Sequence, residues 1–295
     1  AVVMQEMCLQ VDDKVVINTV AKAGSNVRCA GEDISKGSVV LTAGTRLRPQ
    51  ELGLAASIGI AEFKVRRKLK VAMFFTGDEI VAPGHALAPG QIYNSNRYTL
   101  QGLLQAMGCE IVDLGIVPDT LEATSDVLTQ AAASADLVIT SGGVSVGEED
   151  YVRIALQQLG ELSMWRIAMK PGKPVAFGKV DNAVFMGLPG NPVSVFVTFL
   201  IFARAAIMKM QGIDDCLPKR IPVLADFDWP SVKRQEYLRV QLAEKEGQVV
   251  ARLFPHQGSG VLSSASWADG LVEVFIGKET KRGDTVNYIP FQGLF

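Results

Sequence analysis

In the middle of the chain, short continuous apolar runs alternate with longer stretches whose apolar residues recur at helical spacing. The runs predict strands at residues 70–75, 110–114, 137–140, 174–179 and 183–186. The longer stretches predict helices at residues 94–107, 119–133, 150–159 and 192–211. This alternation predicts an α/β domain of three layers (α/β/α), with helices on both faces of a mainly parallel sheet. Ligands of such sheets bind beyond the carboxyl ends of the strands.

The N-terminal part of the chain has a different pattern. Residues 1–31 hold short β-rich runs, at residues 1–11, 14–21 and 26–30, that are separated by glycines. The chain begins inside such a run, so we expect part of a larger protein to be missing before it. In residues 32–66, a short helix is predicted at 49–57, with proline in its first turn.

The C-terminal part returns to β patterning. Five strand-like runs are separated by turn signals such as Glu246-Gly247 and Gly283-Asp284, and they predict a small β-barrel or sandwich. The pattern therefore divides the chain into four parts. Residues 1–31 are the remnant of a β-rich domain and residues 32–66 the remnant of a linking domain. Residues 67–216 form the α/β domain and residues 217–295 the C-terminal β-barrel domain.

Charge and composition exclude several kinds of protein. The 295 residues hold 29 Lys and Arg against 31 Asp and Glu, so there is no basic excess to bind nucleic acid. The longest apolar stretch, 193–210, is interrupted by Ser194, Thr198, Arg204 and Lys209, which favours a buried helix over a membrane span. The four cysteines form no C-x-x-C pair and only two histidines are present, so a structural zinc site is not expected. Free cysteines and the lack of a signal-peptide pattern predict a cytoplasmic protein.

Polar and glycine-rich loops follow the strands of the predicted α/β domain. They comprise Thr76-Gly77-Asp78-Glu79, then residues 115–119 ending in Asp119, then Ser141-Gly142-Gly143-Val144-Ser145-Val146-Gly147 followed by Asp150, then residues 169–174 with Lys170 and Lys173, and finally Gly187-Leu188-Pro189-Gly190-Asn191-Pro192-Val193-Ser194. Because the carboxyl ends of parallel strands meet at one edge of a sheet, we expect these loops to lie together.

Each loop suits a particular chemistry. Glu79, Asp119 and Asp150 are carboxylates that would bind a hard cation such as Mg²⁺, which in turn suits a phosphate-bearing substrate. The paired glycines after Ser141 let backbone amides approach a phosphate or a flat ring. Lys170 and Lys173, in a loop stiffened by prolines, would hold an oxyanion.

Taken singly, these residues have simpler interpretations. Asp119 and Asp150 could be helix N-caps, with Asp119 and Glu122 spaced as a capping box, and isolated lysines are usually solvated. The five residues 143–147 also match the G-x-S-x-G elbow of serine hydrolases, with Ser145 as nucleophile and His256 as base. Acidic residues separate this motif from the predicted helix, which disfavours the hydrolase.

Together the loops resemble the molybdopterin molybdenumtransferase family, which includes MoeA and the gephyrin E domain. The resemblance rests on residues 76–79, Gly90-Gln91-Ile92-Tyr93-Asn94 with Asn96, residues 141–147 with Asp150, residues 170–174, residues 187–194, and Gly31-Glu32-Asp33-Ile34. Family members also begin with an Asp-Asn-Ser-Ala-Met-Asp-Gly-Tyr-Ala segment, and this chain does not contain it.

The resemblance implies a reaction. Adenylylated molybdopterin and molybdate would give molybdenum cofactor and AMP on a molybdopterin-binding fold, with Mg²⁺ at Glu79, Asp119 and Asp150. Asp33 would add a further catalytic carboxylate from the neighbouring region. The residues expected to bind pterin and adenylate are Thr76, Gly77, Asp78, Ser141, Gly142, Gly143, Val144, Ser145, Gly147, Pro189, Gly190, Asn191 and Pro192. Lys170, Lys173 and Ser194 would bind molybdate.

The resemblance also implies a homodimer, with molybdopterin adenylyltransferase and apo-molybdoenzymes as further partners, and neither nucleic acid nor membrane. Two alternatives remain at this stage. The related adenylyltransferase shares the α/β domain but typically has Gly-Gly-Thr-Gly where this chain has Gly-Gly-Val-Ser, and a scaffold of the same fold would need no chemistry. Arg234, Glu236 and Arg239 would either close the cleft or form an exposed charged strand face.

Overall fold

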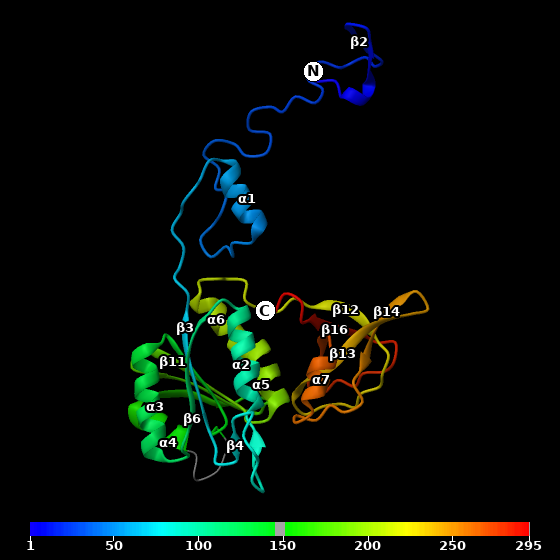
Figure 1. Cartoon of the computed structure of the whole chain (residues 1–295). Helices are drawn as coiled ribbons and strands as arrows, with labels where there is room; N and C mark the ends of the chain where they lie inside the picture. The colour runs from blue at the N-terminus through cyan, green and yellow to red at the C-terminus, as the bar shows by residue number, and fades with distance from the viewer. Residues whose placement is uncertain (145–150, 295) are drawn as a thin grey trace. The chain divides into compact units, whose positions relative to one another are not determined.

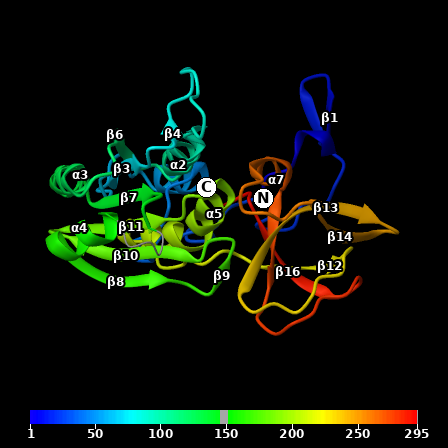
Figure 2. The same cartoon turned by 90° about the horizontal axis from the view of Figure 1, so that it is seen from below.

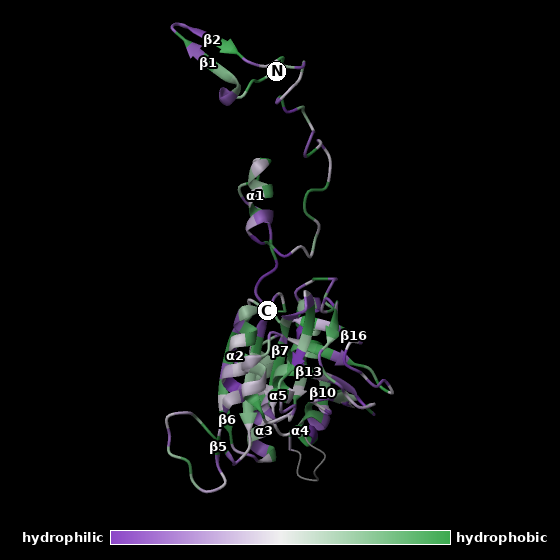
Figure 3. Cartoon of the chain, turned by 90° about the vertical axis from the view of Figure 1, so that its right-hand side faces the viewer, coloured by the Kyte–Doolittle hydropathy of each residue, from purple (hydrophilic) through white to green (hydrophobic). Residues whose placement is uncertain are grey.

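The computed structural model describes residues 1–144 and 151–294 and divides the chain into two compact units, Ala1–Lys64 and Val65–Phe295. Figure 1 shows the elements of both. The first unit contains a 3-10 turn, η1 (Gln5–Met7), and an antiparallel hairpin of β1 (Cys8–Val11) and β2 (Lys14–Ile17). The hairpin contains hydrophobic residues, as its colour in Figure 3 indicates. Val15 and Ile17 among them are exposed. The unit therefore has little apolar core of its own.

Two predictions about the first unit have different outcomes. The helix is confirmed as α1 (Pro49–Ser57), and the Glu51 carboxylate accepts a hydrogen bond from the Arg48 backbone N–H at 2.9 Å. The predicted strand at 26–30 is wrong. Asn26 has a φ of 54°, in the left-handed region, and so lies in a turn that cannot continue a strand.

The second unit contains a six-stranded sheet with the order β6-β3-β7-β11-β10-β8. Its first four strands are parallel: β6 (Glu110–Val117), β3 (Lys70–Thr76), β7 (Leu137–Ser141) and β11 (Ala183–Leu188). The last two, β10 (Pro174–Val180) and β8 (Gly160–Arg166), are antiparallel to their neighbours. The carboxyl ends of the four parallel strands consequently lie at one edge.

Helices cover both faces of this sheet, as predicted (Figure 1). Helices α3 (Leu121–Ser134) and α4 (Tyr151–Leu159) pack on one face. The other face is covered by α2 (Ser95–Ala106) and by a continuous helical segment composed of α5 (Pro192–Thr198), a π-helical stretch η2 (Phe199–Ala203) and α6 (Arg204–Met210). The α/β/α class is confirmed.

Strand β3 shows why the sheet is buried on both faces. Val71, Met73 and Phe75 belong to the core under α2 and α5, whereas Ala72 and Phe74 belong to the core under α3. All five are fully buried. Successive side chains of a strand point to opposite faces, so a continuous apolar run is what a doubly covered strand requires.

The segment Pro192–Met210 is long and apolar enough to cross a membrane by length and composition. However, 56% of its most apolar window is buried inside the protein. Val193, Val197 and Ile207 contribute to the core and are fully buried. This burial agrees with the prediction of a core helix.

Strand β8 was not predicted, although the helix before it does end at Leu159. Gly160 follows that helix directly and begins the strand. A Cβ atom there would lie 1.9 Å from the backbone oxygen of Lys179 on β10. Glycine is therefore required by the close approach of two strands rather than by a helix cap alone. The proposed start of the helix at Asp150 falls outside the described residues.

The C-terminal β domain is a closed barrel (Figure 2). Its strands are β12 (Ile221–Ala225), β13 (Gln235–Lys245), β14 (Gln248–Leu253), β15 (Gly270–Val274) and β16 (Thr285–Pro290). The ring closes because β14 pairs with both β12 and β13. The expected small barrel is thus confirmed; a short helix, α7 (Leu262–Trp267), was not anticipated.

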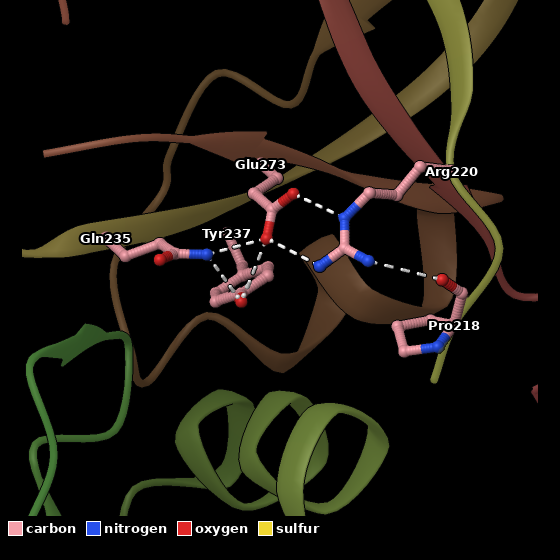
Figure 4. Close-up of polar contacts among 5 residues, drawn as sticks. All are labelled: Pro218, Arg220, Gln235, Tyr237 and Glu273. Carbon is pink, nitrogen blue, oxygen red and sulfur yellow. Dashed lines mark hydrogen bonds and ion pairs between the residues drawn. The ribbon is translucent and has the colours of Figure 1, made fainter. Parts of the chain in front are cut away.

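A buried carboxylate fixes one side of the barrel (Figure 4). Glu273 accepts hydrogen bonds from Arg220 Nε at 2.7 Å, from Gln235 Nε2 at 2.6 Å and from the Tyr237 hydroxyl at 3.3 Å. Burial, with the nearby Glu273 charge, raises the pKa of Tyr237 to about 12. Tyr237 is therefore a neutral donor at physiological pH, and the network ties the segment before β12 to the start of β13.

The two domains of the second unit share a strand pairing. The short strand β9 (Met169–Lys170) follows β8 in the α/β domain but pairs in parallel with β13 of the barrel, Gln235 opposite Met169 and Glu236 opposite Lys170. A second two-stranded pair, β4 (Ile80–Val81) with β5 (Ile92–Tyr93), follows β3. Neither pair was predicted, because two-residue strands leave no periodic signal.

Candidate active site

A cleft of about 630 Å³ lies in the second unit between the strand-end loops of the α/β domain and the barrel. It brings together residues of four predicted loops: Thr76, Glu79, Ser141, Gly142, Lys170, Lys173, Pro189, Gly190, Asn191, Pro192 and Ser194. These loops follow β3, β7 and β11 or precede β10, so the sheet topology explains their convergence.

Other predicted residues lie elsewhere. Gly77, Asp78, Gly143 and Val144 belong to the same loops but do not line the cleft. Asp33 is exposed in the first unit. Ser145, Gly147 and Asp150 fall outside the described residues.

Asp119 is not a helix cap. Helix α3 is capped by Thr120, whose side chain accepts a hydrogen bond from the Ala123 backbone N–H at 3.2 Å. The predicted capping box of Asp119 and Glu122 is therefore wrong. Asp119 instead accepts a hydrogen bond at 2.7 Å from the hydroxyl of Thr76, at the end of the neighbouring strand β3. That bond leaves the second carboxylate oxygen of Asp119 without a partner among the described residues.

Glu79 adds a second carboxylate near this sheet edge. It is exposed, lines the cleft and makes no side-chain hydrogen bond or ion pair within the described part of the chain. Across residues 1–144 and 151–294, no group of three or more His, Cys, Asp or Glu side chains is placed to hold a metal ion. Two of the three predicted carboxylates thus belong to the ends of adjacent strands.

Lys170 is held in place rather than free. Its ammonium group donates a hydrogen bond to Glu236 at 2.9 Å, and the other oxygen of Glu236 accepts from the Trp229 indole N–H at 3.1 Å. Glu236 is only 6% exposed. Lys170 and Glu236 are opposite each other in the pairing of β9 with β13, so this ion pair joins the lysine to the barrel at one side of the cleft.

The alternative of an exposed charged strand face on β13 is wrong. Glu236 and Arg239 are buried, because β13 is covered by β9 on one edge and by α7. Arg234 is half-buried, lines the cleft and donates a hydrogen bond to the backbone oxygen of Met169 at 3.2 Å. Lys173 is exposed on the cleft and has no partner among the described residues. The wall formed by Lys170, Lys173 and Arg234 is therefore cationic.

Arg239 organises the barrel side of the cleft. Its guanidinium donates to the Ser264 hydroxyl at 3.0 Å and to the backbone oxygen of Gly258 at 3.1 Å, and Gln257 bonds to the Arg239 backbone. Burial lowers the pKa of Arg239 to about 10, so the group remains charged at neutral pH. No carboxylate forms an ion pair with it in the described residues, which leaves a buried positive charge beside the loop.

The sequence prediction missed the loop that Arg239 supports. Gln257, Gly258 and Ser259 line the cleft, and the Ser259 backbone oxygen accepts from the Val193 N–H at 2.9 Å. The glycines in His256-Gln257-Gly258-Ser259-Gly260 signal a loop, but nothing in one sequence places it against α5. His256 itself is exposed and does not line the cleft, which gives the serine hydrolase alternative no support.

Gly142 and Gly143 are required by the backbone after β7. Their φ angles are +93° and +62°, in the region that favours glycine. A Cβ atom at Gly143 would lie 2.7 Å from Val152 Cγ2. The loop therefore passes tightly between Thr76 and the first turn of α4, and the Gly142 N–H donates to the Leu188 backbone oxygen at 3.2 Å.

Fold and cleft together define a class: an α/β domain with a polar cleft at its strand ends, fused to a small barrel. Comparisons with known proteins agree. Residues 72–209 match the family profile of a probable molybdopterin binding domain, residues 222–291 the MoeA C-terminal region (domain IV) and residues 1–59 the MoeA N-terminal region (domains I and II).

Sequence and structural relatives place the chain in one family. It is 42% identical to a molybdopterin molybdenumtransferase of Haemophilus influenzae, over 100% of this chain and 74% of that protein. A molybdopterin molybdenumtransferase of Nostoc is 40% identical over 72% of this chain and 50% of its own length. The MoeA crystal structure of Pyrococcus horikoshii OT3 superposes with a TM-score of 0.77 at 28% identity, covering 98% of this chain and 71% of that one. The chain belongs to the molybdopterin molybdenumtransferase family and is a transferase of molybdenum cofactor biosynthesis.

Proposed function

We propose that this protein transfers molybdate to adenylylated molybdopterin and releases AMP, forming molybdenum cofactor. One observation is the main support: a single cleft combines a cationic wall, Lys170 with Lys173 and Arg234, with the glycine-rich loops at the strand ends. Such a cleft suits a substrate with both anionic and flat heterocyclic parts. Family membership supplies the identity of those parts.

The carboxylate side of the site would hold Mg²⁺. Glu79 and Asp119 are oxygen donors of the kind that Mg²⁺ prefers, and Asp119 has one oxygen without a protein partner among the described residues. Asp150, the third predicted ligand, lies outside the described residues. The ion would neutralise charge on the phosphoryl group. Thr76 fixes the Asp119 carboxylate by a 2.7 Å hydrogen bond, so it would act as a positioning residue.

The cationic wall would bind molybdate. Lys173 and Arg234 line the cleft, Lys170 is fixed by the buried Glu236, and Ser194 is a buried hydroxyl on the same lining. The buried charge of Arg239 adds to the positive potential there. A molybdate oxygen would attack the adenylyl phosphorus, and the phosphoanhydride bond between AMP and the molybdopterin phosphate would break. The dithiolene sulfurs would then displace AMP from the molybdenum, so the proposal needs no protein nucleophile.

Further parts of the proposal rest on family resemblance alone. They are a homodimer, participation of Asp33, transfer of substrate from a molybdopterin adenylyltransferase, delivery to apo-molybdoenzymes and a cytoplasmic location. The four free cysteines are compatible with a reducing compartment.

The test is AMP release from purified adenylylated molybdopterin with Mg²⁺, measured with and without molybdate. We expect molybdate-dependent release and a product that activates a molybdenum-free apoenzyme. Lys170→Ala should lose the molybdate dependence, whereas Lys179→Ala, an exposed lysine on β10 outside the cleft, should not. ATP-dependent adenylylation of molybdopterin instead would identify the adenylyltransferase, and binding without chemistry would identify a scaffold.

A further inference from the structure

Two buried amide side chains in the cleft lining have an atom without a hydrogen-bond partner. Asn94 and Asn96 are 4% and 9% exposed, at the start of α2. Asn94 Nδ2 and Asn96 Oδ1 lack any partner among the described residues. Buried polar atoms are almost always paired, and an unpaired one destabilises the protein unless a ligand or water satisfies it.

Neighbouring groups fix the orientation of both amides. Asn96 Nδ2 donates to the Gly190 backbone oxygen at 2.7 Å and to the Ser141 hydroxyl at 2.8 Å. A carbonyl oxygen can only accept, so the nitrogen must face Gly190 and the Oδ1 acceptor is the atom left unpaired. Asn94 Oδ1 accepts from the Arg97 backbone N–H at 3.1 Å and caps α2, which leaves its Nδ2 donor unpaired.

One unpaired atom is a donor and the other is an acceptor, so only a ligand with both an acceptor and a donor can satisfy the two. A fully ionised oxyanion such as molybdate or a phosphodiester offers only acceptors, so it could satisfy Asn94 Nδ2 but not Asn96 Oδ1. A heterocycle with adjacent C=O and N–H groups offers one group to each. We propose that Asn94 and Asn96 are specificity residues that bind the lactam edge of the substrate's pterin ring. This inference rests on the proposed function and assigns one part of its site.

The geometry also assigns Asn96 a positioning role. Its amide joins α2 to the end of β7 through Ser141 and to the loop after β11 through Gly190. Because Ser141 accepts from Asn96, the hydroxyl hydrogen of Ser141 is free to donate in turn. A ring bound at Asn96 would therefore be placed directly beside the strand-end loops of the cleft.

The decisive variant is Asn94→Asp. Aspartate caps helices as well as asparagine does, so the bond to Arg97 is kept, while the unpaired donor becomes an acceptor that carries a negative charge. The probe is free pterin, titrated by its fluorescence, with molybdate binding followed by calorimetry. We expect the pterin Kd to rise about tenfold or more. Asn182→Asp, an exposed asparagine between β10 and β11, makes the same chemical change outside the cleft and should alter neither Kd.

A ligand change tests Asn96 without disturbing the loops. N3-methylpterin lacks the ring N–H that Asn96 Oδ1 would accept, and wild-type protein should bind it about tenfold more weakly than pterin. A pterin Kd within twofold of wild type in Asn94→Asp, or equal affinity for both pterins, overturns the inference. If the wild-type protein binds molybdate but not pterin, the inference is wrong and the proposed function is unaffected. If it binds neither, the proposed function is wrong as well.

Discussion

Single side chains at the strand ends are held by neighbours from other strands or from the barrel. Asp119 is bonded to Thr76 and Lys170 to Glu236, and in both cases the partner is far away in the sequence. The sequence indicated the residue types and their loops, but it could not show that Thr120, one residue after Asp119, caps the helix. The predicted cap at Asp119 was wrong because capping depends on backbone geometry and not on the spacing of residues alone.

Replacing Glu79 by glutamine tests the carboxylate at the residue scale. Glu79 is exposed and makes no side-chain contact within the described residues, so Glu79→Gln should leave thermal unfolding nearly unchanged. Turnover should fall about tenfold or more, because a bound cation contributes several kcal/mol of charge stabilisation. Molybdate-dependent AMP release measured across Mg²⁺ concentrations checks this, and unchanged turnover at every concentration would remove Glu79 from the site.

Replacing Glu236 tests how Lys170 is held. Glu236→Gln keeps an acceptor for Trp229 but removes the charge that fixes the lysine. We expect the molybdate KM to rise several-fold with a smaller change in kcat, because the ammonium group loses its fixed position. Arg220→Gln, which disturbs the barrel ion pair with Glu273 instead, is the matched control for general damage to the barrel. Equal KM values for the two variants would argue against a specific role of Glu236.

Burial should protect one thiol from alkylation. Burial raises the pKa of Cys109 to about 11, so the reactive thiolate is scarce at pH 8 and becomes abundant only as the pH approaches 11. Cys29 is exposed. At pH 8, mass spectrometry after brief iodoacetamide treatment should show modified Cys29 and unmodified Cys109; comparable labelling of both in the folded protein would contradict the burial.

At the scale of elements, long apolar runs were predicted well and short or locally irregular elements were not. The core strands β3, β7 and β11 are apolar along most of their length, as doubly covered strands usually are. Strand β8 and helix α7 were missed, since the first continues directly from α4 and the second spans one and a half turns. The candidate loops could be predicted because they adjoin the core strands in the sequence. The barrel residues that line the cleft could not be predicted, because their position depends on long-range packing.

A cap substitution tests the start of α3. Thr120→Ala removes the hydrogen bond to the Ala123 N–H and should lower the free energy of unfolding by about 1 kcal/mol. Thr129→Ala, in the interior of the same helix, removes a hydroxyl that bonds back to the Ser125 backbone oxygen and should have little effect. Denaturant unfolding measures both, and equal effects would refute Thr120 as the cap.

At the scale of the whole molecule, the two units differ in how much they bury. The described residues of the second unit form three hydrophobic clusters, whereas in the first unit only Glu51 and Ala55 are buried. A stable fold requires that the free energy gained by burying apolar surface exceed the conformational entropy cost of ordering the chain. The stability of this protein therefore comes from residues 65–295.

A fragment tests this division. Residues 65–295 alone should unfold cooperatively, with a midpoint close to that of the whole chain, because every hydrophobic cluster is retained. Residues 1–64 alone should show no cooperative transition by calorimetry. A large loss of stability in the longer fragment would show that the first unit contributes to the core.

The pairing of β9 with β13 has a consequence for how the gene can be rearranged. Because Met169 and Lys170 form part of the barrel's sheet while lying within the α/β segment of the chain, the two domains are not interchangeable modules. An α/β domain cut out after residue 216 would lose β13, the strand that pairs with β9 and so orders the loop of Lys170 and Lys173. A barrel transplanted from another protein would have to match the register of Glu236 with Lys170. Recombination at the apparent domain boundary would therefore separate two strands that must be inherited together.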